Sequence, residues 1–219
     1  MEKSFNGKTV LLTAGPTYEP IDPVRFIGNH STGKMGFAIA ECFAARGAKV
    51  QLVAGPTNMK AHHGGITVIP VTTADEMFTA VKRLAPTADI WVFAAAVADY
   101  KPKVVADRKI KKAGAEFTIE LVKNVDIAAA LGKEKREDQF AVGFALETDN
   151  EDSNAREKLI KKNLNMIVLN SLNDPGAGFK HDTNKITIIE HDTTTAFELK
   201  QKSEVAQDIV NLIWERLYA

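Results

Sequence analysis

The segment 28–36, GNHSTGKMG, carries the residue types that bind phosphate groups. Its glycines and Lys34 match the spacing of a nucleotide-binding P-loop, but Met35 stands where that loop needs a hydroxyl for magnesium. A P-loop also follows its strand directly, and here the first apolar strand ends well before residue 28, so an ATPase loop is disfavoured. The apolar helix that follows still favours an anion at its N-terminus. The alternative is a helix N-cap at Ser31 or Thr32 without a ligand.

Two further groups of residues have the chemistry to hold a nucleotide. Small residues in the run 94–100 end an apolar strand and would let a flat ligand lie against the backbone. Asp99, just past that strand, suits a metal ion, a base or a ribose, or simply caps a turn. Basic side chains gather at 108–112 and at Lys158 and Lys162, which share a helix face. They suit a triphosphate or two phosphorylated substrates, although a charge run is usually a solvated face.

The stretch 14–25 forms a long loop after the first strand. It holds three prolines together with Glu19, Asp22 and Arg25. A stiff loop at the carboxyl end of a strand is usually functional, and the alternative is a packed Ω-type loop. No G-x-G-x-x-G appears, which argues against NAD or FAD. No Cys or His spacing predicts zinc.

The overall composition gives no sign of a highly charged partner. Lys plus Arg and Asp plus Glu both number 28, so the formal net charge of the 219 residues is zero, and no global field would attract nucleic acid or an anionic membrane. We interpret the single cysteine, Cys42, as a buried apolar residue of a helix. The N-terminus lacks the apolar core of a signal peptide, and no apolar run approaches the ~20 residues of a membrane span. We therefore expect a cytoplasmic protein.

Apolar runs that alternate with helical patterns predict an α/β fold. We expect a doubly wound, mostly parallel, Rossmann-like sheet in a single domain over residues 1–219. The expected strands are 9–14, 50–54, 66–71, 90–95, 140–146 and 166–169. The expected helices are 34–46, 74–85, 125–131, 154–162 and 204–217. Such sheets bind ligands at the carboxyl ends of their strands.

Two regions break this alternation. Residues from about 100 to 123 are rich in Lys and Arg with little apolar periodicity, and we interpret them as an excursion from the sheet, a flap, that returns through a short strand at 117–122. Toward the C-terminus, a Gly/Pro/Asn-rich loop at 170–184 precedes an antiparallel hairpin formed by 185–189 and 196–199. We expect the flap to lie beside the candidate site.

Five segments, in chain order, resemble a known family. They are TAGPTYEPIDPVRFIGNHSTGKMG (13–36), AAVADY (95–100), KIKK (109–112), LVKNVDI (121–127) and VGFALET (142–148). Together they resemble the bacterial type of phosphopantothenoylcysteine synthetase, and the resemblance covers essentially the whole chain. One departure is Val125, where the family usually has proline. In most bacteria this domain follows a decarboxylase domain in one polypeptide, so the chain is either a separate synthetase or an excised domain.

The resemblance implies a ligase. CTP and 4′-phosphopantothenate form an acyl-cytidylate and pyrophosphate, and the amine of L-cysteine then displaces CMP, in coenzyme A biosynthesis. Asn29 matches the asparagine that contacts the intermediate, and Lys109 matches a lysine needed for the second step and for nucleotide contact. We further assign to the nucleotide Gly15, Phe93, Ala94, Ala95, Asp99, Val125, Asp126, Ile127, Ala128, Phe144, Lys158 and Lys162. We assign to substrate or phosphate binding Arg25, Asn29, Ser31, Thr32, Gly33 and Lys34.

The same resemblance implies Mg²⁺, with ligands that the sequence does not identify, and a homodimer. A separate phosphopantothenoylcysteine decarboxylase is a further expected partner. The KIKK segment favours CTP over the ATP used by eukaryotic relatives. Two other functions stay open on the residues alone: a nucleotide-dependent oxidoreductase of doubly wound fold, and a non-catalytic module that binds a phosphorylated ligand.

Overall fold

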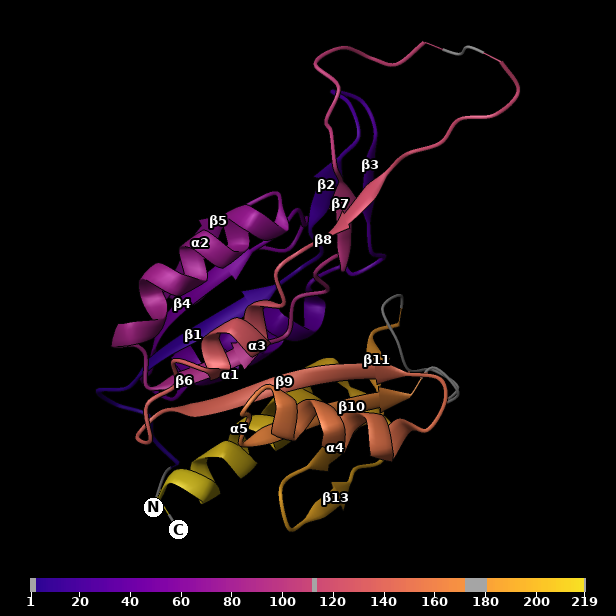
Figure 1. The fold of residues 1–219 in the computed structure, drawn as a ribbon. Helices are drawn as coiled ribbons and strands as arrows, with labels where there is room; N and C mark the ends of the chain where they lie inside the picture. The colour runs from indigo at the N-terminus through magenta and orange to yellow at the C-terminus, as the bar shows by residue number, and fades with distance from the viewer. Residues whose placement is uncertain (1–2, 112–113, 172–180, 219) are drawn as a thin grey trace.

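The computed structural model describes residues 3–111, 114–171 and 181–218. Within them, the centre of the fold is an eight-stranded sheet of order β13-β12-β10-β9-β6-β1-β4-β5 (Figure 1). Its strands are β1 (Thr9–Ala14), β4 (Lys49–Ala54), β5 (Ile66–Pro70), β6 (Ile90–Phe93), β9 (Phe140–Glu147), β10 (Met166–Ser171), β12 (Thr187–Ile189) and β13 (Thr194–Ala196).

The sheet is parallel from β10 to β5, and β12 and β13 continue it antiparallel at the other edge. From β1 the chain passes outward to β4 and β5 and then returns to β6 on the opposite side of β1. The order of the strands therefore reverses between β1 and β6, which makes this the topological switch point. The predicted doubly wound sheet is confirmed, as is the antiparallel C-terminal hairpin, which β12 and β13 form.

Five α-helices and one short 3₁₀ turn cover the two faces of the sheet within the described residues. They are α1 (Lys34–Ala45), α2 (Ala74–Leu84), η1 (Ala85–Thr87), α3 (Ile127–Gly132), α4 (Glu151–Lys161) and α5 (Lys202–Tyr218). One apolar cluster joins α1 and α5 to the sheet, and a second joins α2, α3 and α4 to it. The helices thus divide into two sets, one for each face.

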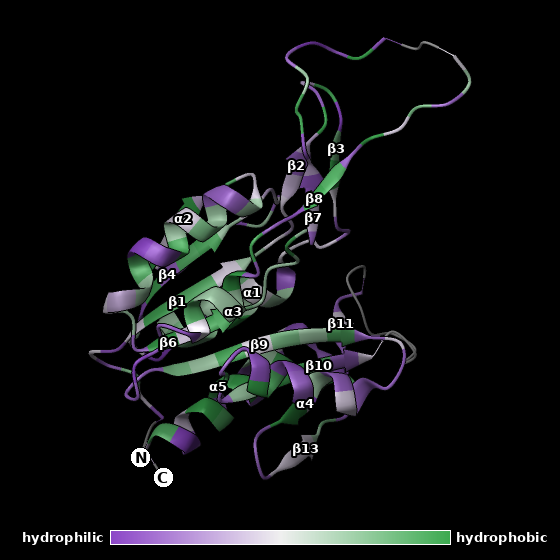
Figure 2. Ribbon diagram, in the orientation of Figure 1, coloured by the Kyte–Doolittle hydropathy of each residue, from purple (hydrophilic) through white to green (hydrophobic). Residues whose placement is uncertain are grey.

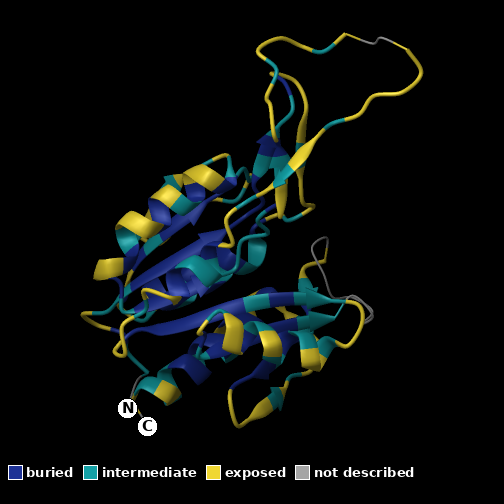
Figure 3. Ribbon diagram, in the orientation of Figure 1, coloured by how far each residue is buried: buried dark blue, intermediate teal, exposed yellow. Residues whose placement is uncertain are grey.

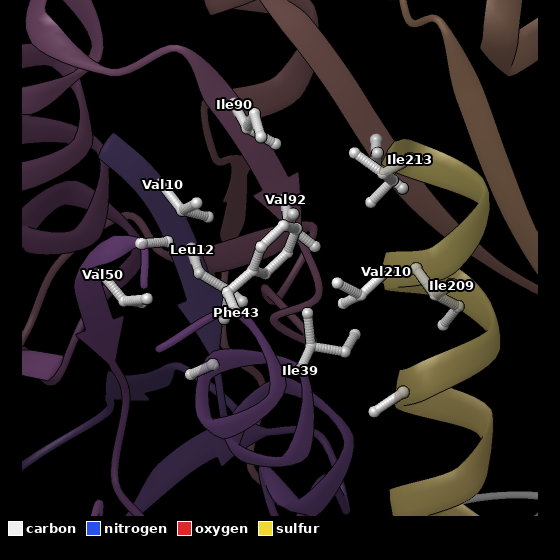
Figure 4. Close-up of a cluster of buried hydrophobic side chains, with 14 of the residues drawn as sticks. Val10, Leu12, Ile39, Phe43, Val50, Ile90, Val92, Ile209, Val210 and Ile213 are labelled. Atoms are coloured by element: carbon white, nitrogen blue, oxygen red, sulfur yellow. The ribbon is translucent and has the colours of Figure 1, made fainter. Parts of the chain in front are cut away.

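The alternation of side chains along each strand explains these two clusters. Val10 and Leu12 of β1 belong to the cluster with α1 and α5, whereas Leu11 between them belongs to the other. Figure 4 shows the first cluster, in which Phe43 of α1 lies beside Leu12 and Val92 of the strands, and Val210 of α5 is on the side of its helix toward Ile39 of α1. The central strands β1, β4, β6, β9 and β10 are largely buried (Figure 3), which is why their sequences read as near-continuous apolar runs.

Most elements lie within a few residues of their predicted positions. Among the helices the largest shift is at α4, which begins at Glu151 instead of 154, and α5 begins at Lys202 instead of 204. The second strand of the C-terminal hairpin, β13 (Thr194–Ala196), overlaps the predicted 196–199 only at Ala196. At the C-terminal end of α1, Gly47 has φ +90°, a left-handed conformation that glycine adopts without strain and that commonly ends a helix. The predicted loop at 170–184 lies mostly outside the described residues.

Two small antiparallel ribbons leave the sheet and form a protrusion, at the top of Figure 1. One pairs β2 (Tyr18–Pro20) with β3 (Phe26–Gly28), and the other pairs β7 (Tyr100–Pro102) with β8 (Leu121–Lys123). We call residues 18–28 and 100–123 the arm. The predicted excursion is present, but its strand at 117–122 is limited to 121–123. The predicted loop 14–25 contains β2 and the turn that leads to β3, so much of it belongs to the β2–β3 hairpin.

The base of the arm is tied to the body by a buried carboxylate. Glu19 of β2 is 1% exposed, and its Oε1 accepts a hydrogen bond of 2.9 Å from the backbone N–H of Ala74, at the start of α2. The backbone N–H of Tyr18 donates to the carbonyl of Thr72 at 2.8 Å. Beyond this base the arm is mostly exposed and of mixed hydropathy (Figures 2 and 3). A further short pair, β11 (Thr183–Asn184) with β14 (Lys200–Gln201), precedes α5.

Candidate functional site

A cavity of about 440 Å³ lies at the carboxyl ends of the parallel strands. Its lining includes the ends of β1, β6, β9 and β10, the starts of α1 and α3, and lysines from α1, α4 and α5. This is the edge where open α/β sheets bind ligands, next to the switch point between β1 and β6.

The loop after β6 forms the floor of the cavity and is held from several sides. The Thr13 hydroxyl oxygen accepts from the backbone N–H of Ala95 at 3.2 Å, and that of Thr17 accepts from Ala98 at 3.0 Å. The side-chain amide of Asn124 donates to the carbonyl of Ala98 at 2.8 Å. A short run of small residues in the cavity lining, Ala94–Ala98, is thereby held in place.

Asn29 lines the cavity and bridges to this same loop. Its Nδ2 lies 3.1 Å from the carbonyl oxygen of Ala96 and 3.3 Å from that of Val97. The preceding Gly28 is packed so tightly that a Cβ there would lie 2.7 Å from a ring carbon of Tyr18. The donor half of the Asn29 amide therefore holds the strand-end loop, and the side chain has a fixed orientation at the switch point.

The N-cap residue of α1 is Gly33, with φ +80°, and it has no side chain that could cap the helix. The hydroxyl oxygens of Ser31 and Thr32 accept from the backbone N–H groups of Gly33 at 3.3 Å and of Lys34 at 3.5 Å. The alternative of an N-cap at Ser31 or Thr32 is therefore wrong. Helix α1 also approaches β1 closely, because a Cβ on Gly36 would lie 2.6 Å from the Cβ of Ala14. This contact places the helix start at the end of β1.

On the face of the sheet that α3 and α4 cover, three charged side chains meet the cavity. Asp126 caps α3, since its Oδ1 accepts from the backbone N–H of Ala129 at 3.0 Å, and its Oδ2 lies 3.0 Å from Nζ of Lys162. Lys158 pairs with Glu147 at the end of β9. Two ammonium groups and the start of a helix thus lie on this side.

On the face that α1 and α5 cover, a second pair of lysines lines the cavity. Lys34 pairs with Asp182, which holds the pKa of that carboxyl below its usual value. Lys202 is 8% exposed, and its Nζ donates to the carbonyl of His181 at 2.5 Å. Burial and, second, the charge of Lys34 lower the pKa of Lys202. Asn184, 3% exposed, lies beside them in the lining.

The model of one protein family, described as the DNA/pantothenate metabolism flavoprotein C-terminal domain, matches residues 5–217. The chain belongs to this family. The chain is 46% identical over 215 residues to the coenzyme A biosynthesis bifunctional protein CoaBC of Haemophilus influenzae, covering 98% of this chain and 53% of that protein. A prokaryotic protein named cysteine/cysteine sulfinic acid decarboxylase is 54% identical, over 97% of this chain and 59% of that protein. The chain thus spans about half the length of the curated relatives it matches.

The family resemblance extends to a solved structure. The crystal structure of the C-terminal domain of coenzyme A biosynthesis bifunctional protein CoaBC matches with a TM-score of 0.83 and 40% identity, covering 99% of this chain and 98% of that one. The match confirms the α/β sheet. Among the described residues of this family member, no helix is long and apolar enough to cross a membrane.

All but three of the residues assigned to the site from the sequence line the cavity. Those that do are Asn29, Ser31, Thr32, Gly33, Lys34, Phe93, Ala94, Ala95, Asp99, Val125, Asp126, Ile127, Ala128, Phe144, Lys158 and Lys162. Gly15 lies behind the floor: its carbonyl accepts from the N–H of Ala96 at 2.9 Å, and its φ of +77° suits glycine. Arg25 and Lys109 lie on the arm.

Arg25 and the flap are joined by a buried aspartate. Asp22 accepts from Nε of Arg25 at 3.0 Å and from the backbone N–H of Ile110 at 3.1 Å, and Arg25 also donates to the Ile110 carbonyl at 3.1 Å. The guanidinium of Arg25, helped by backbone N–H groups, holds the pKa of Asp22 far below its usual range, against the opposing effect of burial. We call this set of hydrogen bonds among Asp22, Arg25 and Ile110 the clamp. The exposed Lys109 is adjacent to Ile110, so the clamp holds the backbone at Lys109 in place.

Among the polar side chains of the cavity lining, five were not assigned from the sequence: Thr13, Asn124, Asn170, Asn184 and Lys202. Asn124 falls inside a segment that was recognised, but only its neighbours were assigned. One feature of the sequence could have indicated Lys202: it lies at the start of the last helix, where the helix dipole disfavours a cation, so a lysine there is unusual. Nothing in the local sequence distinguishes Asn170 or Asn184 from other loop asparagines.

The described residues hold no group of three or more His, Cys, Asp or Glu side chains placed for a metal ion. The carboxylates in the cavity lining are Asp99 and Asp126. Mg²⁺ is usually held by one or two carboxylates together with substrate phosphates and water. This sparse set therefore fits a magnesium ion that arrives with a nucleotide, and does not fit a cage made by the protein alone.

Proposed function

We propose that the chain joins 4′-phosphopantothenate to L-cysteine through an acyl-cytidylate, using CTP and releasing pyrophosphate and CMP, in coenzyme A biosynthesis. The observation that carries this proposal is the cavity itself. It has lysines on both faces of the sheet, Lys158 and Lys162 on one and Lys34 and Lys202 on the other, with the Asn29-held loop between them. A site with two basic ends suits two phosphorylated reactants.

We assign the nucleotide to the face of α3 and α4. The backbone at Phe93–Ala95 and the start of α3 offer hydrogen-bonding groups to a base and ribose, and Asp99 is exposed at the rim. Lys158 and Lys162 carry the charge that a triphosphate requires. Each already holds a carboxylate, Glu147 and Asp126, so both ammonium groups are oriented before a ligand arrives.

In the first step, a carboxylate oxygen of phosphopantothenate attacks the α-phosphorus of CTP. A carboxyl oxygen–phosphorus bond forms, the bond from the α-phosphorus to the bridging oxygen breaks, and pyrophosphate leaves with the electron pair. Holding the two anions in line lowers the barrier more than any single side chain does. The lysines stabilise the charge that develops on the phosphoryl oxygens, and Mg²⁺ would supply further neutralisation of the triphosphate at Asp99 and Asp126.

In the second step, the amine of L-cysteine attacks the activated carbonyl. A carbon–nitrogen bond forms, the bond to the cytidylate oxygen breaks, CMP leaves, and the nitrogen loses a proton. The carbonyl oxygen becomes anionic on the way. We assign the stabilising cation to Lys109, which must then come over the cavity from the arm.

The arm also supports a homodimer. Large apolar side chains are exposed along it: Val24, Phe26, Val104, Val105, Phe117 and Leu121, with Val104 77% exposed. An exposed apolar set of this kind is typical of a protein interface. Packing of the arm against a second copy would cover these side chains and would bring basic arm residues beside a cavity.

A pyrophosphate-release assay tests the function. With phosphopantothenate we expect release with CTP, and CTP should exceed ATP by at least ~100-fold in kcat/KM, which is about 3 kcal/mol. Without L-cysteine, release should stop after about one turnover, since the intermediate stays bound.

The other outcomes of this assay are equally informative. Absence of release with either nucleotide would refute the ligase and leave a binding module. Fluorescence-detected binding of NADH would instead favour the oxidoreductase. The decarboxylation named for one relative is not assigned here, because the chain covers 59% of that protein.

A further inference from the structure

The loop that follows β4 supports the cavity from outside it. We call its residues 55–63 the brace; all of them are described residues, and none lines the cavity. At one end of the brace, the backbone N–H of Gly55 donates to the carbonyl of Ala14, the last residue of β1, at 2.9 Å. Near the other end, the backbone N–H of His62 donates to Oε1 of Glu41 on α1 at 2.5 Å. The brace is therefore tied both to β1 and to the side of α1.

One side chain of the brace reaches the segment that lines the cavity. The hydroxyl of Thr57 donates to the carbonyl oxygen of Thr32 at 2.7 Å. The oxygen of the same hydroxyl accepts from the backbone N–H of Met59 at 3.1 Å, so its proton is left for the carbonyl. Met59 packs against the apolar cluster that joins α1 and α5 to the sheet. Thr57 thus holds a cavity residue from a packed support.

The peptide bond between Thr32 and Gly33 needs such a support. Gly33 has φ +80°, and glycine adopts both signs of φ at little cost, so the peptide before it turns over easily. Another residue could not stiffen this position, because a Cβ on Gly33 would lie 3.3 Å from Oγ1 of Thr57 and 3.3 Å from the backbone nitrogen of Gly15. The N–H of the peptide donates to the Ser31 hydroxyl at 3.3 Å, a longer and weaker bond.

The orientation of this peptide decides which charge the cavity meets. A carbonyl oxygen is partly negative, and the carbonyl and the N–H of one peptide point in opposite directions. The carbonyl of Thr32 now faces Thr57, outside the cavity lining. If the peptide turned over, the oxygen would move to the side of Lys34 and the start of α1, where it would oppose the anionic reactants of the proposed reaction.

We propose that Thr57 is a positioning residue of the ligase: its hydroxyl holds the Thr32 carbonyl away from the cavity and so keeps segment 29–34 in the form that accepts the acid substrate. Thr57 acts through Thr32 and is not itself a catalytic residue. It lies between the first two of the five segments that carry the family resemblance, so the resemblance gives it no role. The effect on the reaction rests on the proposed function, whereas the hold on the peptide does not.

Thr57→Val tests the effect on the reaction, because it replaces the hydroxyl by a methyl group of similar shape. A protein that is only partly in its competent form binds more weakly but reacts normally once the ligand is bound. We therefore expect the KM for phosphopantothenate to rise about 5- to 10-fold, the scale of one neutral hydrogen bond. The kcat and the KM for CTP should stay within about twofold of wild type.

Two further variants serve as controls. Thr57→Ser keeps the hydroxyl and should return the KM for phosphopantothenate to the wild-type value. Thr79→Val makes the same substitution on α2, at an exposed residue outside the cavity lining whose hydroxyl donates to the Asp75 carbonyl at 2.8 Å. It should leave every kinetic constant unchanged.

Amide hydrogen exchange of the free protein, measured by NMR, tests the hold itself. In Thr57→Val the amides of Gly33 and Lys34 should exchange several-fold faster, while those of α5 and the melting temperature stay at the wild-type values. Thr57→Ser and Thr79→Val should exchange like wild type. A merely structural role would instead lower the melting temperature, speed exchange throughout α1, and reduce kcat without changing KM.

A wild-type KM for phosphopantothenate in Thr57→Val would overturn the proposal, whether or not exchange at Gly33 is faster. A rise in KM that Thr57→Ser does not reverse would overturn it too, because the hydroxyl would then not be the cause. If the wild-type protein releases no pyrophosphate, the proposed function fails. Exchange at Gly33 in Thr57→Val then decides separately whether Thr57 holds the peptide.

Discussion

The cavity edge of the sheet and the arm both carry residues assigned to the site, but they hold them in different ways. At the cavity edge, Asn29, Thr13 and the loop after β6 are joined by hydrogen bonds above a buried core. On the arm, Lys109 is exposed, and a polar clamp centred on Asp22 holds its neighbour Ile110. Hydrogen bonds are used in both places, but at the cavity edge they lie directly on the buried core, whereas on the arm they lie away from it.

This difference shows that one chain alone fixes the positions of the residues at the cavity edge but does not supply all the surroundings of the arm. The cavity edge has its final shape because packing determines it. The arm has a defined fold but large exposed apolar side chains, so part of its surroundings must come from elsewhere. We therefore expect changes on the arm to alter chemistry or association without altering stability, and changes at the cavity edge to act on chemistry through the floor of the cavity.

The largest effect is expected at Lys109. Lys109→Gln should release pyrophosphate at close to the wild-type rate in a single turnover but form product about 100- to 1000-fold more slowly, as when one donor to an oxyanion is lost. The melting temperature should not change. Lys111→Gln, exposed two residues along the same segment, is the control and should be active. If Lys109→Gln forms product at the wild-type rate, Lys109 takes no part in the reaction, and the active site consists of residues at the cavity edge alone.

At the cavity edge, Asn29→Asp should slow product formation about 100-fold, again the scale of one lost donor. The carboxylate would face the carbonyl oxygens of Ala96 and Val97 in place of the amide that now lies 3.1 and 3.3 Å from them. The floor of the cavity should move, while unfolding stays within a few degrees of wild type. Asn150→Asp makes the same change at an exposed residue outside the cavity lining and should be neutral. Near-normal turnover of Asn29→Asp would contradict this placement of the reacting centre.

A charge on the apolar side of the arm should affect association. Val104→Asp would place a carboxylate among side chains that we expect to pack against a second copy, and should weaken dimerisation at least tenfold, which is about 1.4 kcal/mol. Analytical ultracentrifugation of wild type and variant measures it. Ile160→Asp, at an apolar residue 71% exposed on α4, is the control. A monomeric wild-type protein would show that the arm is exposed for another reason.

The smallest effect is expected at the clamp. Asp22→Asn should raise hydrogen exchange of the flap amides several-fold, on the scale of local opening, with Asp107→Asn as the exposed control on the same arm. The folded-state pKa of Asp22 is lowered, so its contribution is present above the unfolded value of about 3.9 and is lost as the pH falls below it. Exchange protection that is flat from pH 8 to 5 and declines near pH 4 is therefore expected.

The sequence predicted the sheet well, because strands buried on both faces carry long apolar runs such as residues 9–14. It did not predict β2 and β3, since strands of three residues are too short to give a periodic signal, and β2 in addition ends in proline. The cavity was predicted where its residues lie in recognisable segments. Lys202 and Asn184 were not, because the contact between α1 and α5 that brings them to Lys34 joins positions more than 140 residues apart and leaves no local pattern.

The bond between Glu19 and the start of α2 has a consequence for the order in which the molecule folds. Its partners are 55 residues apart in sequence, and the acceptor is useful only once Ala74 belongs to a helix docked on the sheet. The direction of the arm is therefore set late, after the parallel core has formed. A refolding chain should pass through a stage in which the sheet is native and the arm is still free to turn.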